Sequence, residues 1–228
     1  MLEPPRASFE SMLKLPKDEV IFSVQAPAGS FMARDEVLID MSREVVAGGA
    51  KSLRLARKGV IAEFAGQLPV IGLIKTDRIG FETRITQSQT EISDIANVGG
   101  QIVAIDSTLR QRPESLENLY QYAIDKGLEI VADIDDLISA KNAVRLGATY
   151  IATTMSGYTD SRMMTIGPDF ELLENVINLG VPTLLEGRVR NAQHINRAFE
   201  MGAHAVVIGR SITSPRDIVK VLLEEIAR

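Results

Sequence analysis

The chain has 228 residues, 45% of them apolar, with 25 basic and 30 acidic side chains and a formal net charge of −5. This length fits one domain, and the charge excludes a general attraction to nucleic acid or an anionic membrane. The absence of cysteine excludes disulfides and thiolate chemistry, and two histidines disfavour a three-histidine metal site, so we expect no bound metal.

The N-terminal residues precede the first predicted strand. The sequence MLEPPRASFE places two prolines and two glutamates where a signal peptide needs an apolar run, and no segment reaches the ~20 apolar residues of a membrane span. We therefore predict a cytoplasmic protein with no membrane partner. Within residues 1–19, Phe9, Met12 and Leu13 form either a small helix that caps the bottom of the domain or a loosely docked tail.

Eight short apolar runs alternate with amphipathic segments along the chain. The runs are mostly continuous rather than alternating, which is typical of parallel strands buried on both faces. The predicted strands are 20–25, 52–56, 70–75, 101–106, 128–134, 150–154, 182–187 and 205–209. The predicted helices are 36–47, 57–67, 113–127, 136–146, 169–179, 192–201 and 215–226, several of them ended by glycine.

This alternation predicts an α/β fold, a (β/α)₈ barrel formed by residues 1–228 as a single domain. A doubly wound open sheet is the competing interpretation, but eight parallel units in so short a chain are more economically closed than open. The longest loops, 76–89 and 155–168, both follow strands. In a barrel such loops lie on the catalytic face.

Polar residues end several of the apolar strands, where a barrel places its active site. Lys75 ends VIGLIK, and loss of hydration among apolar neighbours lowers the pKa of a lysine, which suits a proton carrier or a Schiff-base nucleophile. Glu186 ends PTLLEG and is either an acid/base group, a partner of Lys75, or half of a structural ion pair. Asp133 ends EIVADI and either binds sugar hydroxyls or caps the next helix, although Asp135 and Asp136 are better placed for the cap.

Three further strand-end residues are less specific. Gln25 and Arg54 end the first two strands and can bind oxygen ligands. Asp106, with Arg110 after it, either supports Lys75 from the next strand or forms a structural ion pair.

The last two loops resemble the phosphate sites of barrels, which use loops after strands seven and eight. Gly187 and Arg188 follow one strand, and Gly209 and Arg210 follow the other. Neither a G-x-G-x-x-G nor a Walker motif is present, so dinucleotide and nucleotide cofactors lack support. His194 and His204 are interpreted as structural or surface residues.

The chain resembles the N-acetylmannosamine-6-phosphate 2-epimerase family, in the ribulose-phosphate-binding barrel group. The motifs that carry the resemblance span nearly the whole chain in order. They are SVQAPAGSFM, AGGAKSLRLA, PVIGLIK, RITQSQTEI, IVAIDSTLRQRP, VADI, TTMSGYT, PDFELL, LLEGR and VVIGRSIT.

The resemblance implies an isomerase of amino-sugar and sialic acid catabolism. It interconverts N-acetylmannosamine 6-phosphate and N-acetylglucosamine 6-phosphate by proton transfer at C2, without a redox cofactor. It makes Lys75 and Glu186 the catalytic pair, places Gln25, Arg54 and Asp133 on the sugar with Tyr158 nearby, and makes a homodimer plausible. A Schiff-base sugar-phosphate aldolase or lyase and a non-catalytic sugar-phosphate-binding barrel are the alternatives.

One position departs from the family. The family often has an arginine near the phosphate where this chain has Ser214, in GRSITSP. Arg210, four residues earlier, replaces the missing charge in our hypothesis.

Overall fold

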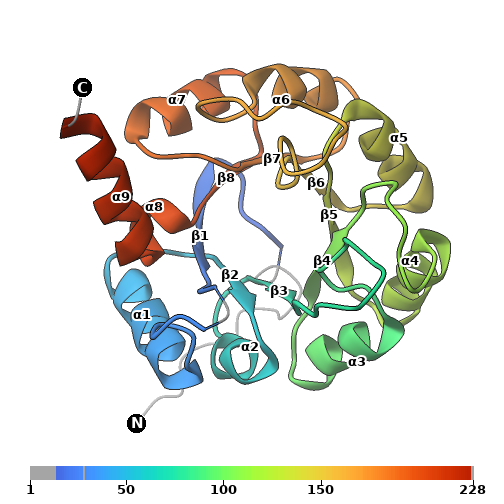
Figure 1. Ribbon diagram of the computed structural model, residues 1–228. Coiled ribbons are helices and arrows are strands. Elements are labelled where there is room, and N and C mark those ends of the chain that lie inside the picture. The colour runs from blue at the N-terminus through green and yellow to red at the C-terminus, as the bar shows by residue number, and fades with distance from the viewer. Residues whose placement is uncertain (1–13, 28, 227–228) are drawn as a thin grey trace, which may run out of the picture.

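The computed structural model describes residues 14–27 and 29–226, and eight parallel strands close into a barrel in the order of the sequence (Figure 1). β1 closes the barrel by pairing with β8 over four register positions. This confirms the (β/α)₈ barrel and excludes the open sheet. The strands are β1 Glu19–Val24, β2 Leu53–Ala56, β3 Val70–Leu73, β4 Ile102–Asp106, β5 Glu129–Asp133, β6 Tyr150–Ala152, β7 Thr183–Glu186 and β8 Ala205–Ile208.

Helices surround the barrel on its outside (Figure 1). Their bounds are α1 Asp35–Ala47, α2 Lys58–Phe64, α3 Gln89–Asn97, α4 Leu116–Asp125, α5 Leu137–Leu146, α6 Phe170–Ile177, α7 Ala192–Glu200, α8 Arg210–Thr213 and α9 Pro215–Ile226. Within the described part of the chain, no helix combines the length and apolar character needed to cross a membrane.

Three helices differ from the prediction, and one of them, the four-residue α8, was not predicted. α3 was not predicted either, although Ser88 accepts a hydrogen bond from the Glu91 N–H and so caps its first turn. The fourth helix begins at Leu116 rather than near Pro113, because the Ser115 side chain accepts from the Asn118 N–H and fixes the start there.

The core has two layers, one between barrel and helices and one inside the barrel. Inside the barrel, Ile71, Val131, Leu184 and their neighbours fill the lower part. Leu15 joins this inner cluster, and its backbone N–H donates to the Tyr150 hydroxyl at 3.3 Å. The helix predicted around Phe9, Met12 and Leu13 lies outside the described residues.

Candidate active site

A buried arginine and two carboxylates meet at the carboxyl end of the barrel. The Arg54 guanidinium donates to both oxygens of Asp133, at 3.1 and 2.7 Å, and these side chains are 1% and 0% exposed. Glu186 Oε2 lies 3.3 Å from Arg54 Nη1. Three strands, β2, β5 and β7, therefore contribute one charged group each to a single cluster, because inward residues at strand ends converge in a barrel.

Hydrogen bonds from a neighbouring segment fix this cluster. The Thr154 hydroxyl donates to Asp133 Oδ1 at 2.6 Å. The Thr153 hydroxyl donates to the Glu186 carbonyl at 2.9 Å and accepts from the Glu186 N–H at 3.0 Å. Burial raises the pKa of Glu186, while the Arg54 charge opposes that rise. The Asp133 carboxylate and the Glu186 backbone are thus held in position before any ligand arrives.

Lys75 lies just after β3, within electrostatic reach of this cluster. Its side chain is exposed at the barrel mouth, but nearby protein atoms still displace part of the water around its amine. This loss of hydration, together with the positive charge of Arg54, lowers the pKa of the Lys75 amine, while Glu186 and Asp133 partly offset the effect. Both carboxylates already form ion pairs with Arg54. The Lys75 amine, with its lowered pKa, therefore lies beside a cluster whose negative charges are already paired.

Several polar atoms in the site lack hydrogen-bond partners among the described residues. They are Gln25 Oε1, Arg54 Nε and Glu186 Oε2, all buried. The Gln25 amide nitrogen is occupied, since it donates to Ser23 Oγ at 2.9 Å. Unpaired buried polar atoms are costly and rare, so their clustering here indicates a place where ligand hydroxyls complete the hydrogen bonding.

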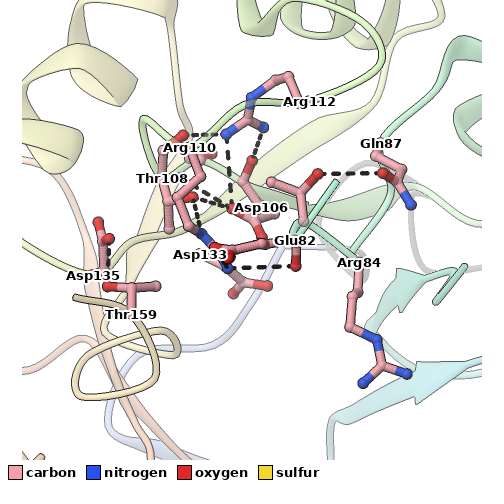
Figure 2. Close-up of polar contacts among 12 residues, drawn as sticks. Glu82, Arg84, Gln87, Asp106, Thr108, Arg110, Arg112, Asp133, Asp135 and Thr159 are labelled. Atoms are coloured by element: carbon pink, nitrogen blue, oxygen red, sulfur yellow. Dashed lines mark hydrogen bonds and ion pairs between the residues drawn. The ribbon is translucent and has the colours of Figure 1, made fainter. Parts of the chain in front are cut away.

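The loop between β6 and α6 lies at the rim of the barrel by β6 and β7 (Figure 1). Two buried acids hold it. Asp169 accepts from the Ser156 hydroxyl at 2.6 Å and from Arg162 Nε at 2.9 Å. Asp135 accepts from the Thr159 hydroxyl at 2.8 Å, a contact drawn in Figure 2. Sequence reasoning gave neither acid this role, because both resemble helix caps in the sequence.

Arg188 is also engaged by this loop. Its guanidinium donates to the carbonyl of Gly167 at 2.8 Å, to the carbonyl of Ser156 at 2.7 Å and to the Thr165 hydroxyl at 3.0 Å. Its backbone has a φ of 58°, which follows Gly187 at 109°. The Arg188 side chain, which we predicted to bind phosphate, is therefore hydrogen-bonded to the loop in this structure.

Arg210 meets Tyr158 across the mouth. The Arg210 guanidinium donates to the Tyr158 hydroxyl at 2.6 Å, which joins the loops after β6 and β8. Gly209 packs closely against β1, since a Cβ there would lie 3.3 Å from Ser23 Cβ, a tight contact. Ser214, at the position of the family arginine, is buried and accepts from the Asp217 N–H at 3.4 Å at the start of α9.

Asp106 belongs to a separate network beside the site. Its carboxylate accepts from Arg110 at 2.8 Å and from the Thr108 hydroxyl at 2.7 Å, and Arg112 donates to its backbone carbonyl (Figure 2). Burial raises the pKa of Asp106 against these donors. The direct contacts of Asp106 are therefore those of a structural ion pair with Arg110. Asp106 can support Lys75 only through other residues.

Known proteins resemble the chain over nearly its whole length. The family "Putative N-acetylmannosamine-6-phosphate epimerase" matches residues 38–228. A Clostridioides difficile relative named "Putative N-acetylmannosamine-6-phosphate 2-epimerase" is 32% identical over 220 residues, covering 94% of this chain and 99% of its own. A Thermosynechococcus vestitus relative of that name is 36% identical, covering 85% and 87%. The solved N-acetylmannosamine-6-phosphate 2-epimerase of Clostridium perfringens matches with a TM-score of 0.89 at 28% identity, covering 99% of both chains.

Proposed function

The chain belongs to the N-acetylmannosamine-6-phosphate 2-epimerase family, and from this premise we propose that Lys75 is the base that removes the sugar C2 proton. The reaction interconverts N-acetylmannosamine 6-phosphate and N-acetylglucosamine 6-phosphate. The observation that carries the assignment is the amine of depressed pKa beside the Arg54–Asp133–Glu186 cluster.

The chemistry requires a base of this kind. The C2 proton becomes acidic only when the sugar ring is open and C1 is an aldehyde. Lys75 in its neutral form accepts that proton, and a lowered pKa makes the neutral form available closer to neutral pH. The electron pair left at C2 is delocalised into an enolate, and return of a proton to the opposite face of C2 gives the epimer.

Arg54 stabilises the negative charge that develops as the enolate forms, and Glu186 supports Arg54 in this role. A fixed cation near a forming enolate oxygen lowers the barrier because it needs no reorganisation during the reaction. Asp133 and Glu186 hold the Arg54 guanidinium in place. In our proposal Glu186 exchanges protons with the sugar hydroxyls through Oε2, which is ion-paired with Arg54 but accepts no hydrogen bond among the described residues, and Gln25 and Asp133 bind the sugar.

We assign the substrate phosphate to the loops after β7 and β8. Arg210 is its principal ligand in this proposal, because its partner in the structure is a neutral tyrosine hydroxyl that an anion can replace. Gly187 and Gly209 permit close approach of backbone N–H groups. Arg188 contributes by holding the loop that carries Tyr158.

The direct test is proton NMR in D₂O with N-acetylmannosamine 6-phosphate. We expect signals of N-acetylglucosamine 6-phosphate to grow while the C2 proton signal disappears. Lys75→Ala should lower turnover by at least about 10³-fold, within the range of general base catalysis. Lys51→Ala, which removes a surface lysine paired with Glu19, is the matched control and should match the unaltered protein.

Two results contradict the assignment. A loss of only a few-fold in Lys75→Ala would remove Lys75 as the base. Borohydride trapping of a substrate adduct on Lys75 would instead support Schiff-base chemistry, since proton transfer at C2 leaves no covalent adduct.

A cytoplasmic homodimer is the form we propose for the protein. α9 exposes Val219, Leu222, Leu223 and Ile226, whose spacing places them on one face of the helix. An exposed apolar face of this kind is typical of an association surface.

Light scattering should give twice the mass of one chain, and Leu222→Glu combined with Leu223→Glu should give a monomer. A monomeric unaltered protein would contradict the dimer.

A further inference from the structure

β3 and β4 separate below the catalytic end of the barrel. They pair directly at only two register positions, Ile71 with Ile102 and Gly72 with Val103, whereas β4 and β5 pair at five. Above this point residues 84–86, the inserted segment, lie between the two strands. The segment gives the barrel wall its last row at the mouth, where Lys75 is found.

Backbone hydrogen bonds attach the inserted segment to both neighbours. On the β3 side, the Thr86 N–H donates to the Ile74 carbonyl at 2.8 Å and the Thr76 N–H donates to the Arg84 carbonyl at 3.1 Å. On the β4 side, the Asp106 N–H donates to the Ile85 carbonyl at 3.0 Å. The two residues that flank Lys75 are therefore both bonded to this segment.

The pairing geometry directs Lys75 inward. Lys75 and Ile85 are opposite one another in an isolated antiparallel bridge. Residues opposite each other in an antiparallel pair project to the same side. Ile85 is 6% exposed and packs in the inner barrel cluster with Leu73 and Ala104. The bridge thus places the Lys75 side chain on the inner side of the barrel wall at the solvent-open mouth, where Arg54 and Glu186 act on its amine.

Thr86 is the residue that fixes the segment against Lys75. It is fully buried, with a φ of 41°, in a backbone region that β-branched residues rarely adopt. Its hydroxyl accepts from the Ile74 N–H at 3.2 Å, so Thr86 makes two hydrogen bonds to the residue just before Lys75. Such backbone conformations persist only where surrounding contacts hold them, and they concentrate at functional sites.

Side chains around the segment hold it from both ends. The Thr83 hydroxyl donates to Gln87 Oε1 at 3.2 Å, and Gln87 Nε2 donates to the Thr76 carbonyl at 2.6 Å. At the other end, Arg110 bridges the Asp106 carboxylate at 2.8 Å and the Glu82 carbonyl at 3.4 Å (Figure 2). The loop therefore has its own polar framework, of which the side chains of Thr83, Gln87 and Asp106 are fully buried.

We propose that the inserted segment is a positioning element for catalysis, with Thr86 as the positioning residue that holds Lys75 against the Arg54–Asp133–Glu186 cluster. The inference rests on the proposed role of Lys75 as the base. Thr86 acts through Lys75, so its loss should reduce kcat more than it raises KM.

Thr86→Val tests the proposal, because valine keeps the shape of threonine and removes the hydroxyl. We expect kcat to fall by about 10- to 100-fold, the effect of a misplacement on the order of 1 Å, with little change in KM. Thr86→Ser keeps the hydroxyl and should recover most of kcat. Gln87→Met removes the bond to Thr76 and should act in the same direction, which provides a second variant if Thr86→Val does not fold.

A labelling experiment separates positioning from mere stability. The pH dependence of Lys75 acetylation by acetic anhydride, read by mass spectrometry with Lys51 as internal reference, reports the protonation of the Lys75 amine. In Thr86→Val the Lys75 midpoint should move up toward that of an ordinary lysine, because the amine leaves its desolvated position. An unchanged midpoint together with unchanged kcat, in a variant that is only less stable, would overturn the inference.

The outcomes also distinguish this inference from the proposed function. If Lys75→Ala retains epimerase activity, the proposed function is wrong whatever Thr86→Val does. If Lys75→Ala is inactive and both Thr86→Val and Gln87→Met keep unaltered kcat and labelling midpoints, the positioning role alone is wrong.

Discussion

At the scale of the single residue, Arg210 is the proposed ligand of the substrate phosphate. Ser214, where the family often has arginine, is buried at the start of α9 and carries no charge. Arg210 is exposed at the mouth and bonded to a hydroxyl that a phosphate can displace.

Arg210→Ala should raise the KM for N-acetylmannosamine 6-phosphate by about 10- to 100-fold, the size of one hydrogen bond between charged groups. The measurement is steady-state kinetics, with Tyr158→Phe as the matched control that removes only the present partner of Arg210. An unchanged KM in Arg210→Ala would show that another group supplies the charge.

At the scale of the element, the loop between β6 and α6 depends on Arg188. Three donors of one guanidinium hold residues at both ends of this loop. Removing them leaves the buried Ser156 carbonyl without this donor, which costs on the order of 1–3 kcal/mol, while the Gly167 carbonyl keeps a hydrogen bond from the Thr165 hydroxyl.

Arg188→Met should therefore speed amide hydrogen exchange across residues 155–168, while Arg145→Ala, which removes a surface arginine paired with Glu117, should leave that exchange unchanged. Mass spectrometry of the exchanged protein measures both. If Arg188→Met leaves exchange unaltered and raises KM as Arg210→Ala does, Arg188 is a phosphate ligand rather than a support of the loop.

At the scale of the whole molecule, the buried charges make folding stability depend on pH. Lys75 has a pKa below 10.5 in the folded state, so between that lowered value and 10.5 the unfolded chain binds more protons. Stability attributable to Lys75 therefore rises with pH in that window. Glu186 has a pKa above 4.5 when folded, so between 4.5 and that raised value its contribution falls as pH rises.

Urea unfolding across a pH series should resolve these two contributions. The free energy of unfolding of the unaltered protein, minus that of Lys75→Met, should increase as pH rises through the alkaline window. The free energy of unfolding of the unaltered protein, minus that of Glu186→Gln, should decrease as pH rises through the acid window. Differences that stay flat with pH would mean that neither group has a shifted pKa.

The sequence by itself determined the barrel and the candidate site residues. Eight continuous apolar runs between amphipathic segments leave few alternatives to a closed parallel sheet, and strand ends such as Lys75, Asp133 and Glu186 are visible because charge seldom follows a buried strand without a use. α3 escaped prediction even though Ser88 and Glu91 have the spacing of a capping box.

Only the tertiary structure decided which of these residues touch. Glu186 pairs with Arg54, Arg188 supports a loop, and residues 84–86 enter the barrel wall beside Lys75. Sequence spacing cannot show this, because these contacts join groups from different strands and loops. Closure of the barrel brings strand ends separated by tens of residues to one rim, and side-chain geometry then selects each partner.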